Sequence, residues 1–225
     1  MRDTHIVKSF DKDLNRLTKI IRSAGELAGS QLRLAGRLLE VRESWLPAQV
    51  LESNSRLKSQ VHEVDHLTVN LLALRQPMAI DLRSIVAALK LAADLERVGD
   101  YCVSIARHMT GVDPIAAGAV MHPLQEMADL SLQMLNDTMQ AYNLLNVEKA
   151  IEVWHRDRQL DRIYTNLLTG FPSYMKFDPQ STSVFTSLLF IARCLERIGD
   201  HIKNVDEHIY FVVYGETYQK TAASC

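Results

Sequence analysis

The sequence lacks most of the features that would point to export, membrane insertion or nucleic-acid binding. Its 225 residues include only three cysteines and no C-x-x-C spacing, so neither a disulfide framework nor a structural zinc site is expected. The formal net charge is −2 and the basic residues are scattered, whereas nucleic-acid binders carry a basic face or stripe. The most apolar stretches, SLLFIA near residue 190 and IYFVVY near residue 212, are far below the roughly 20 residues that span a bilayer.

The opening residues, MRDTHIVKSFDKDL, have no apolar core and do not resemble a signal peptide. We therefore expect a cytoplasmic protein without membrane insertion and without a nucleic-acid partner. Cys102 and Cys194 are expected to be small buried hydrophobic residues in a reducing compartment.

Strand signals are also nearly absent. The chain has only 9 Gly and 6 Pro, and no alternating apolar and polar run is bounded by turn dipeptides. Helical periodicity is present almost everywhere instead. The spacing predicts an all-α fold with six helices, at about residues 11–43, 47–75, 80–108, 123–144, 147–168 and 178–214. Gly170-Phe171-Pro172 is expected to end the fifth helix, and Asp178-Pro179 to start the sixth.

The third and sixth predicted helices carry the same motif. Residues 94–108 read DLERVGDYCVSIARH, and residues 194–208 read CLERIGDHIKNVDEH. The chain is therefore interpreted as an internal duplication, with one three-helix bundle in residues 1–112 and a second in residues 113–225. Each half has about 100 residues, enough to bury a core of its own.

The repeated motif contains two features that destabilise a helix. Glu96 and Asp100, like Glu196 and Asp200, are like charges four residues apart, a spacing that costs a helix about 0.2–0.5 kcal/mol. Gly99 and Gly199 lie inside the helices, where glycine costs roughly 1 kcal/mol relative to alanine. The small side chain is expected to let a neighbouring helix, or a ligand, approach closely beside the carboxylates.

Further acidic residues stand on the adjoining helices. Asp65 in the first half, and Asp157 with Asp161 in the second, are expected to face the acidic rows of the motif. Carboxylates that converge in this way hold a cation or are protonated. Oxygen ligands without a thiolate favour Mg²⁺, Ca²⁺, Mn²⁺ or iron. The rows also extend to Ser104 and His108, and to Asn204 and His208, with the histidines as weaker ligand candidates.

Two other readings stand beside the metal site. The first alternative is a structural bundle without metal, whose acidic rows would be exposed to solvent. Arg193 and Lys203 would then supply local counter-charge in the second half. In a ferritin-like di-iron protein the E-x-x-H pairs at 63–66 and 152–155 would carry iron. Those pairs project away from the apolar stripes of their helices and are out of register with the duplication. No nucleophile–base constellation or glycine-rich phosphate loop is present, so no enzyme is predicted.

The stretches RQPMAIDLR (75–83), LERVGD (95–100) and LERIGD (195–200) resemble the PhoU family over essentially the whole chain. The resemblance implies two similar three-helix bundles with metal on paired E/DxxxD faces. It implies a homodimeric negative regulator that couples the phosphate-specific ABC transporter to a sensor histidine kinase, reaching the inner membrane through those partners. By the same resemblance the metal ligands are Glu96, Asp100, Glu196 and Asp200, supported by Asp65, Asp157 and Asp161.

The first half departs from that pattern. In the second half Asp157 and Asp161 form an acid pair four residues apart, and the matching place in the first half, about Asn54, lacks the carboxylate. The first bundle is therefore expected to bind metal more weakly or to hold fewer metal ions, and the two copies are not expected to be equivalent sites.

Overall fold

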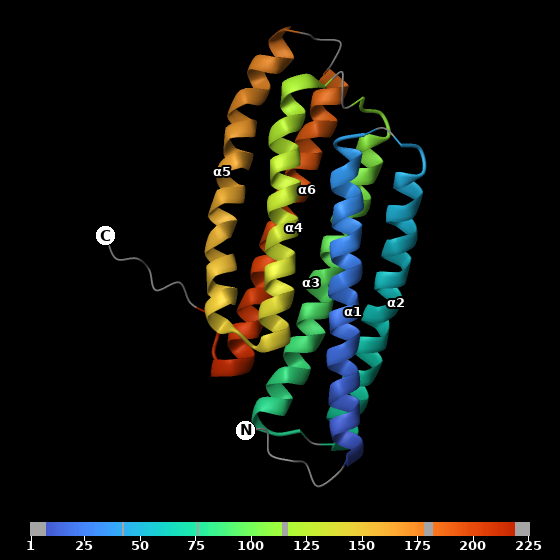
Figure 1. Ribbon diagram of the computed structural model, residues 1–225, viewed down its shortest axis with the longest axis vertical. Coiled ribbons are helices and arrows are strands. Elements are labelled where there is room, and N and C mark those ends of the chain that lie inside the picture. The colour runs from blue at the N-terminus through green and yellow to red at the C-terminus, as the bar shows by residue number, and fades with distance from the viewer. Residues whose placement is uncertain (1–7, 42, 76, 114–116, 178–181, 219–225) are drawn as a thin grey trace, which may run out of the picture.

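Six long helices make up almost all of the computed structural model, which describes residues 8–41, 43–75, 77–113, 117–177 and 182–218 (Figure 1). Those residues contain no strand, so the all-α prediction is confirmed. None of the described helices is both long and apolar enough to cross a membrane. The helices are α1 (Lys8–Leu38), α2 (Leu46–Arg75), α3 (Ala79–Met109), α4 (Met121–Leu144), α5 (Val147–Phe177) and α6 (Thr182–Tyr214), with a short 3-10 turn, η1 (Gly118–Val120), before α4.

The helices form two three-helix bundles lying side by side, α1–α3 and α4–α6 (Figure 1). Helices α3 and α6 form the most extensive helix pair and join the bundles, and α1 packs against α4. Apolar residues of all six helices form one continuous buried cluster, which includes Ile21, Leu57, Leu95, Leu124, Leu160 and Ile198. The tandem bundles are therefore confirmed, whereas a division at residues 112 and 113 stays a prediction. Cys102 and Cys194 are buried free thiols, as expected.

Two predicted helix ends are wrong. Helix α1 stops at Leu38 rather than at 43, because the chain tightens there: the Leu39 amide donates to the Gly36 carbonyl at 2.9 Å, a three-residue step. Helix α5 continues through Gly170 and Pro172 to Phe177. A proline inside a helix removes one amide donor and crowds the carbonyl four residues earlier, at a local cost of about 3 kcal/mol, and the helix can still continue past it. The helix start predicted at Asp178-Pro179 lies outside the described residues.

Candidate metal centre on two acidic helix faces

Side chains of a neighbouring helix lie directly against each of the two motif glycines. A Cβ atom on Gly99 would lie 2.6 Å from Asn54 Oδ1, and one on Gly199 would lie 2.7 Å from Asp157 Oδ1. Real Cβ contacts are essentially never shorter than 3.0 Å. The glycines therefore let α2 pack on α3 and α5 pack on α6. Of the two alternatives, a neighbouring helix or a ligand, it is a neighbouring helix that lies against each glycine. Asn54 and Asp157 hold equivalent places in the two bundles.

In the first bundle, a lysine on α2 neutralises the acidic face of α3. Lys58 Nζ lies 2.9 Å from Asp100 Oδ1 and 3.8 Å from Glu96 Oε1, and Asn54 Nδ2 donates to Asp100 Oδ1 at 3.1 Å. Burial raises the pKa of Asp100, but the hydrogen bonds from Lys58 and Asn54 outweigh burial and hold that pKa below its usual value. Asp65 makes no ion pair with another described residue, and the structure does not bring it to this group.

In the second bundle, the lysine comes from α6 and faces more acid. Lys203 Nζ lies 2.6 Å from Asp157 Oδ2 and 3.3 Å from Asp200 Oδ1. Burial, followed by the charges of Asp200 and Asp161, raises the pKa of Glu196 despite the nearby Arg197. Burial also raises the pKa of Asp157, against the effect of Lys203. Four carboxylates thus share this region with three cations, Lys203, Arg197 and Arg193, so one negative charge remains in excess.

Within the described residues, the ion pairs of Arg97 and Arg197 lie on their own helices. Arg197 contacts Glu196 at 3.5 Å and Asp200 at 3.6 Å, and Arg97 lies 4.0 Å from Asp100. A three-residue step returns the long guanidinium side chain to its own helix face. The arginines therefore neutralise part of the negative charge of their own helix faces.

The second face suits a hard cation better than the first. Asp157 Oδ1 is buried and has no hydrogen-bond partner among the described residues, so one carboxylate oxygen is available there. In the first face the equivalent residue is Asn54, and Lys58 already contacts both acids of α3. In the observed side-chain conformations, no group of three His, Cys, Asp or Glu residues within the described ranges is close enough together to hold a metal ion. A metal ion on the second face would therefore have to displace the Lys203 ammonium.

A polar network between the bundles was not expected from the sequence. Asp94 of α3 has Oδ1 2.8 Å from His201 Nδ1 and Oδ2 3.0 Å from His208 Nε2, and Asn204 Nδ2 donates to Oδ1 at 3.2 Å. Burial raises the pKa of Asp94, but the hydrogen bonds from His201, His208 and Asn204 dominate and lower it to about 2. His208 and Asn204, placed in the acidic row by their spacing, thus join α6 to α3 instead.

One signal could have revealed this network. The repeated motifs begin Asp94-Leu-Glu-Arg and Cys194-Leu-Glu-Arg, so the duplication changes an acid to a thiol at equivalent positions. On the matching side His108 stacks on Phe190, with ring centroids 5.0 Å apart. One side of the α3–α6 contact therefore has a carboxylate network, whereas the other has a buried thiol and a stacked pair of rings.

The two E-x-x-H pairs lie on the surface and do not face a bundle interior. Glu63 pairs with Arg16 at 2.6 Å, and Glu152, whose side chain is 70% exposed, pairs with Arg156 at 2.9 Å. His66 and His155 are both exposed. The structure gives no support to a ferritin-like di-iron site.

The sequence matches one protein family along nearly its whole length. The PhoU domain family model matches residues 21–109 and again residues 124–209. A Caulobacter vibrioides protein is 37% identical over 215 residues, covering 94% of this chain and 93% of that protein. A Xylella fastidiosa protein is 34% identical over 221 residues, covering 98% and 93%. Both are named phosphate-specific transport system accessory protein PhoU homolog.

Solved structures show the same arrangement of helices. The crystal structure of PhoU from Pseudomonas aeruginosa matches with a TM-score of 0.88 at 28% identity, covering 92% of this chain and all of that one. The phosphate transport system regulatory protein PhoU from Streptococcus pneumoniae matches with a TM-score of 0.86 at 27% identity, covering 93% and 99%.

Proposed function

Since the chain belongs to the PhoU family, we propose that it is an accessory regulator of phosphate uptake. In this role it represses the phosphate-starvation response by linking the phosphate-specific ABC transporter to a sensor histidine kinase. The observation that carries the proposal is the match along nearly the whole chain to relatives named as accessory proteins of phosphate-specific transport. The relatives bear the names of accessory and regulatory proteins, not of enzymes.

The proposed setting follows from the partners. A protein that meets both a transporter and a kinase works at the cytoplasmic side of the inner membrane, held there by those partners. Long helices with exposed outer faces offer broad surfaces for such contacts (Figure 1). We further propose a homodimer, in which each copy can meet one partner.

Metal binding is proposed for the acidic faces, and chiefly for the second. Glu196, Asp200, Asp157 and Asp161 supply the carboxylate oxygens that Mg²⁺, Mn²⁺, Ca²⁺ or iron accept. When bound, the ion would neutralise charge that Lys203 and Arg197 balance only in part. The first face, with Glu96, Asp100 and the more distant Asp65, is proposed to bind metal more weakly, because Lys58 already contacts both α3 acids.

The regulatory role is tested genetically. Deleting the gene is expected to derepress phosphate-starvation genes in phosphate-rich medium, measured with a transcriptional reporter. Supplying the intact gene in trans should restore repression. If the reporter stays repressed in the deletion strain, the regulatory proposal is wrong even though the family assignment stands.

A further inference from the structure

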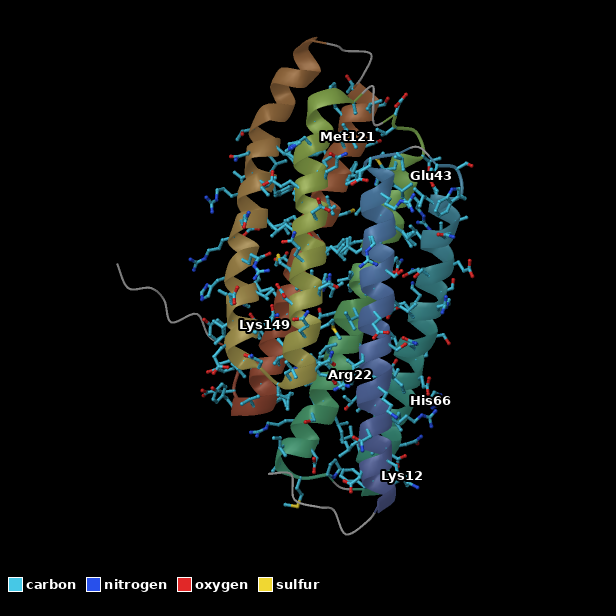
Figure 2. The ribbon with its side chains drawn as sticks, in the orientation of Figure 1. Lys12, Arg22, Glu43, His66, Met121 and Lys149 are labelled. Atoms are coloured by element: carbon cyan, nitrogen blue, oxygen red, sulfur yellow. The ribbon has the colours of Figure 1, made fainter. Side chains whose placement is uncertain are left out.

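A cavity of about 540 Å³ opens where the first half of α1 passes the C-terminal end of α4. Helices α1, α3, α4 and α6 all contribute to it, so it lies between the two bundles. Figure 2 labels Arg22 at this place, beside the lower end of α4. The polar lining consists of Asn15, Thr18, Lys19, Arg22, Ser84 and Asn143.

The cavity has a positively charged wall, formed by the exposed side chains of Lys19 and Arg22. Lys19 and Arg22 stand three residues apart on one face of α1, and no acidic residue lines the cavity. Neither cation makes an ion pair with another residue in the part of the chain that the structure describes. Two other arginines of α1 are paired, Arg16 with Glu63 at 2.6 Å and Arg37 with Glu43 at 3.1 Å, whereas the exposed Arg33 makes no ion pair among the described residues.

The end of α4 does not cancel this charge. A helix C-terminus carries about −0.5 elementary charge, against two full positive charges from α1. The opposite end of the α1–α4 contact shows a different chemistry, because a hollow of about 370 Å³ there is lined by Glu40, Glu126 and Asp129. The two hollows beside the α1–α4 pair therefore favour ligands of opposite charge.

We propose that the basic cavity binds a phosphorylated small molecule, with Lys19 and Arg22 holding its phosphate group. Arginine presents a planar fork to phosphate oxygens, and lysine adds a point charge. The Thr18 and Ser84 hydroxyls already donate to carbonyls of their own helices, so the amides of Asn15 and Asn143 are the neutral donors.

The size and wall of the cavity indicate more than a bare phosphate ion. Its volume falls within the range of small-molecule sites, roughly 300–1,000 Å³. Tyr142, Leu144, Leu145 and Val212 supply an apolar side on which an organic group can lie. An organic phosphate ester is therefore expected to bind more tightly than inorganic phosphate.

The test is equilibrium binding by calorimetry on the purified full chain, with AMP, pyrophosphate, inorganic phosphate and sulfate as separate probes. Saturable binding is expected in the order AMP above inorganic phosphate, with sulfate weakest. Arg22→Gln and Lys19→Gln should each weaken AMP binding by about tenfold, because each removes one charge-assisted hydrogen bond to the phosphate group. Arg33→Gln is the matched control, because Arg33 is exposed on the same helix but does not line the cavity.

The outcomes separate the sources of the ligand. Tighter binding of pyrophosphate or inorganic phosphate than of AMP would overturn the ester and leave an inorganic ligand. If sulfate bound as tightly as AMP, or if Arg33→Gln weakened AMP binding as much as Arg22→Gln does, the attraction would be unspecific and the proposed site would be wrong. The absence of saturable binding at millimolar AMP would also overturn it. Helical circular dichroism confirms that each variant is folded, and the assay needs no transporter, so it is independent of the regulatory role.

Discussion

Lys203 places its ammonium nitrogen 2.6 Å from Asp157 Oδ2, so the acidic face between α5 and α6 contains its own counter-ion. In the first bundle the counter-ion is Lys58, which comes from α2 instead of from the motif helix. The duplicated motif has thus kept its glutamate, glycine and aspartate while the compensating lysine changed helices. This difference leaves more uncompensated acid in the second face.

Replacing Gly199 by alanine should destabilise the protein. A Cβ atom there would overlap Asp157 Oδ1 and Leu160, and overpacking costs about 1–3 kcal/mol, more than the roughly 1 kcal/mol that alanine gains in helix propensity. Gly99→Ala should act similarly through Asn54 and Leu57. Urea unfolding measures the change.

Gly29→Ala is the control for these variants. The nearest atom to a Cβ there is Asn136 Oδ1 at 3.7 Å, an ordinary contact, so this change should be neutral or stabilise by up to about 1 kcal/mol. An equal loss of stability in all three variants would contradict the close-packing explanation.

Asp206→Asn should stabilise the protein increasingly as pH rises. Asp206 is 2% exposed, Thr138 is its hydrogen-bond donor at 2.9 Å, and burial raises its pKa well above the usual 3.8. The folded state therefore binds a proton that the unfolded chain releases above about pH 4, so the wild type loses stability as pH increases from there. Urea midpoints of both proteins from pH 4 to 7 should diverge; parallel curves would refute the buried neutral carboxyl.

Asp94→Asn should have the opposite pH dependence. The pKa of Asp94 falls from 3.8 to about 2, so its charge stabilises the fold at neutral pH by about 2 kcal/mol, and this contribution is lost as pH drops below about 4 towards 2. The variant should be less stable than the wild type at pH 7, and the gap should narrow at pH 3. A gap of constant size would show that the hydrogen bonds to His201 and His208 do not depend on the carboxylate charge.

Lys203→Gln should increase the effect of divalent cations on stability. The change leaves Asp157 buried beside Asp200 without the ammonium, which lowers stability in metal-free buffer and opens the position to a metal ion. Thermal unfolding with and without Mn²⁺ should show a larger metal-induced rise in Tm than in the wild type. Lys58→Gln is the matched control on the first face, and a larger rise there would reverse the proposed ranking of the two faces.

The sequence predicted what depends on local patterns. Helical periodicity and the repeated motif were enough to predict six helices, two bundles and the acidic rows with Gly99 and Gly199. The rotation of each helix about its axis could not be predicted from local patterns, because it depends on contacts between helices. That rotation brings Asn204 and His208 to Asp94 across the α3–α6 contact. The path of α5 through Pro172 was missed because the local pattern predicts that a proline ends the helix, whereas a helix can continue past one at a local cost of about 3 kcal/mol.

The central proposal is that the second acidic face, rather than the first, is the main cation site. Metal content of the full chain, purified without chelator and measured by inductively coupled plasma mass spectrometry, tests it most directly. Ala substitution at both Glu196 and Asp200 should remove most bound metal, while Ala substitution at both Glu96 and Asp100 should leave most of it. Unchanged metal in the first double variant, or an equal loss in both, would contradict the claim.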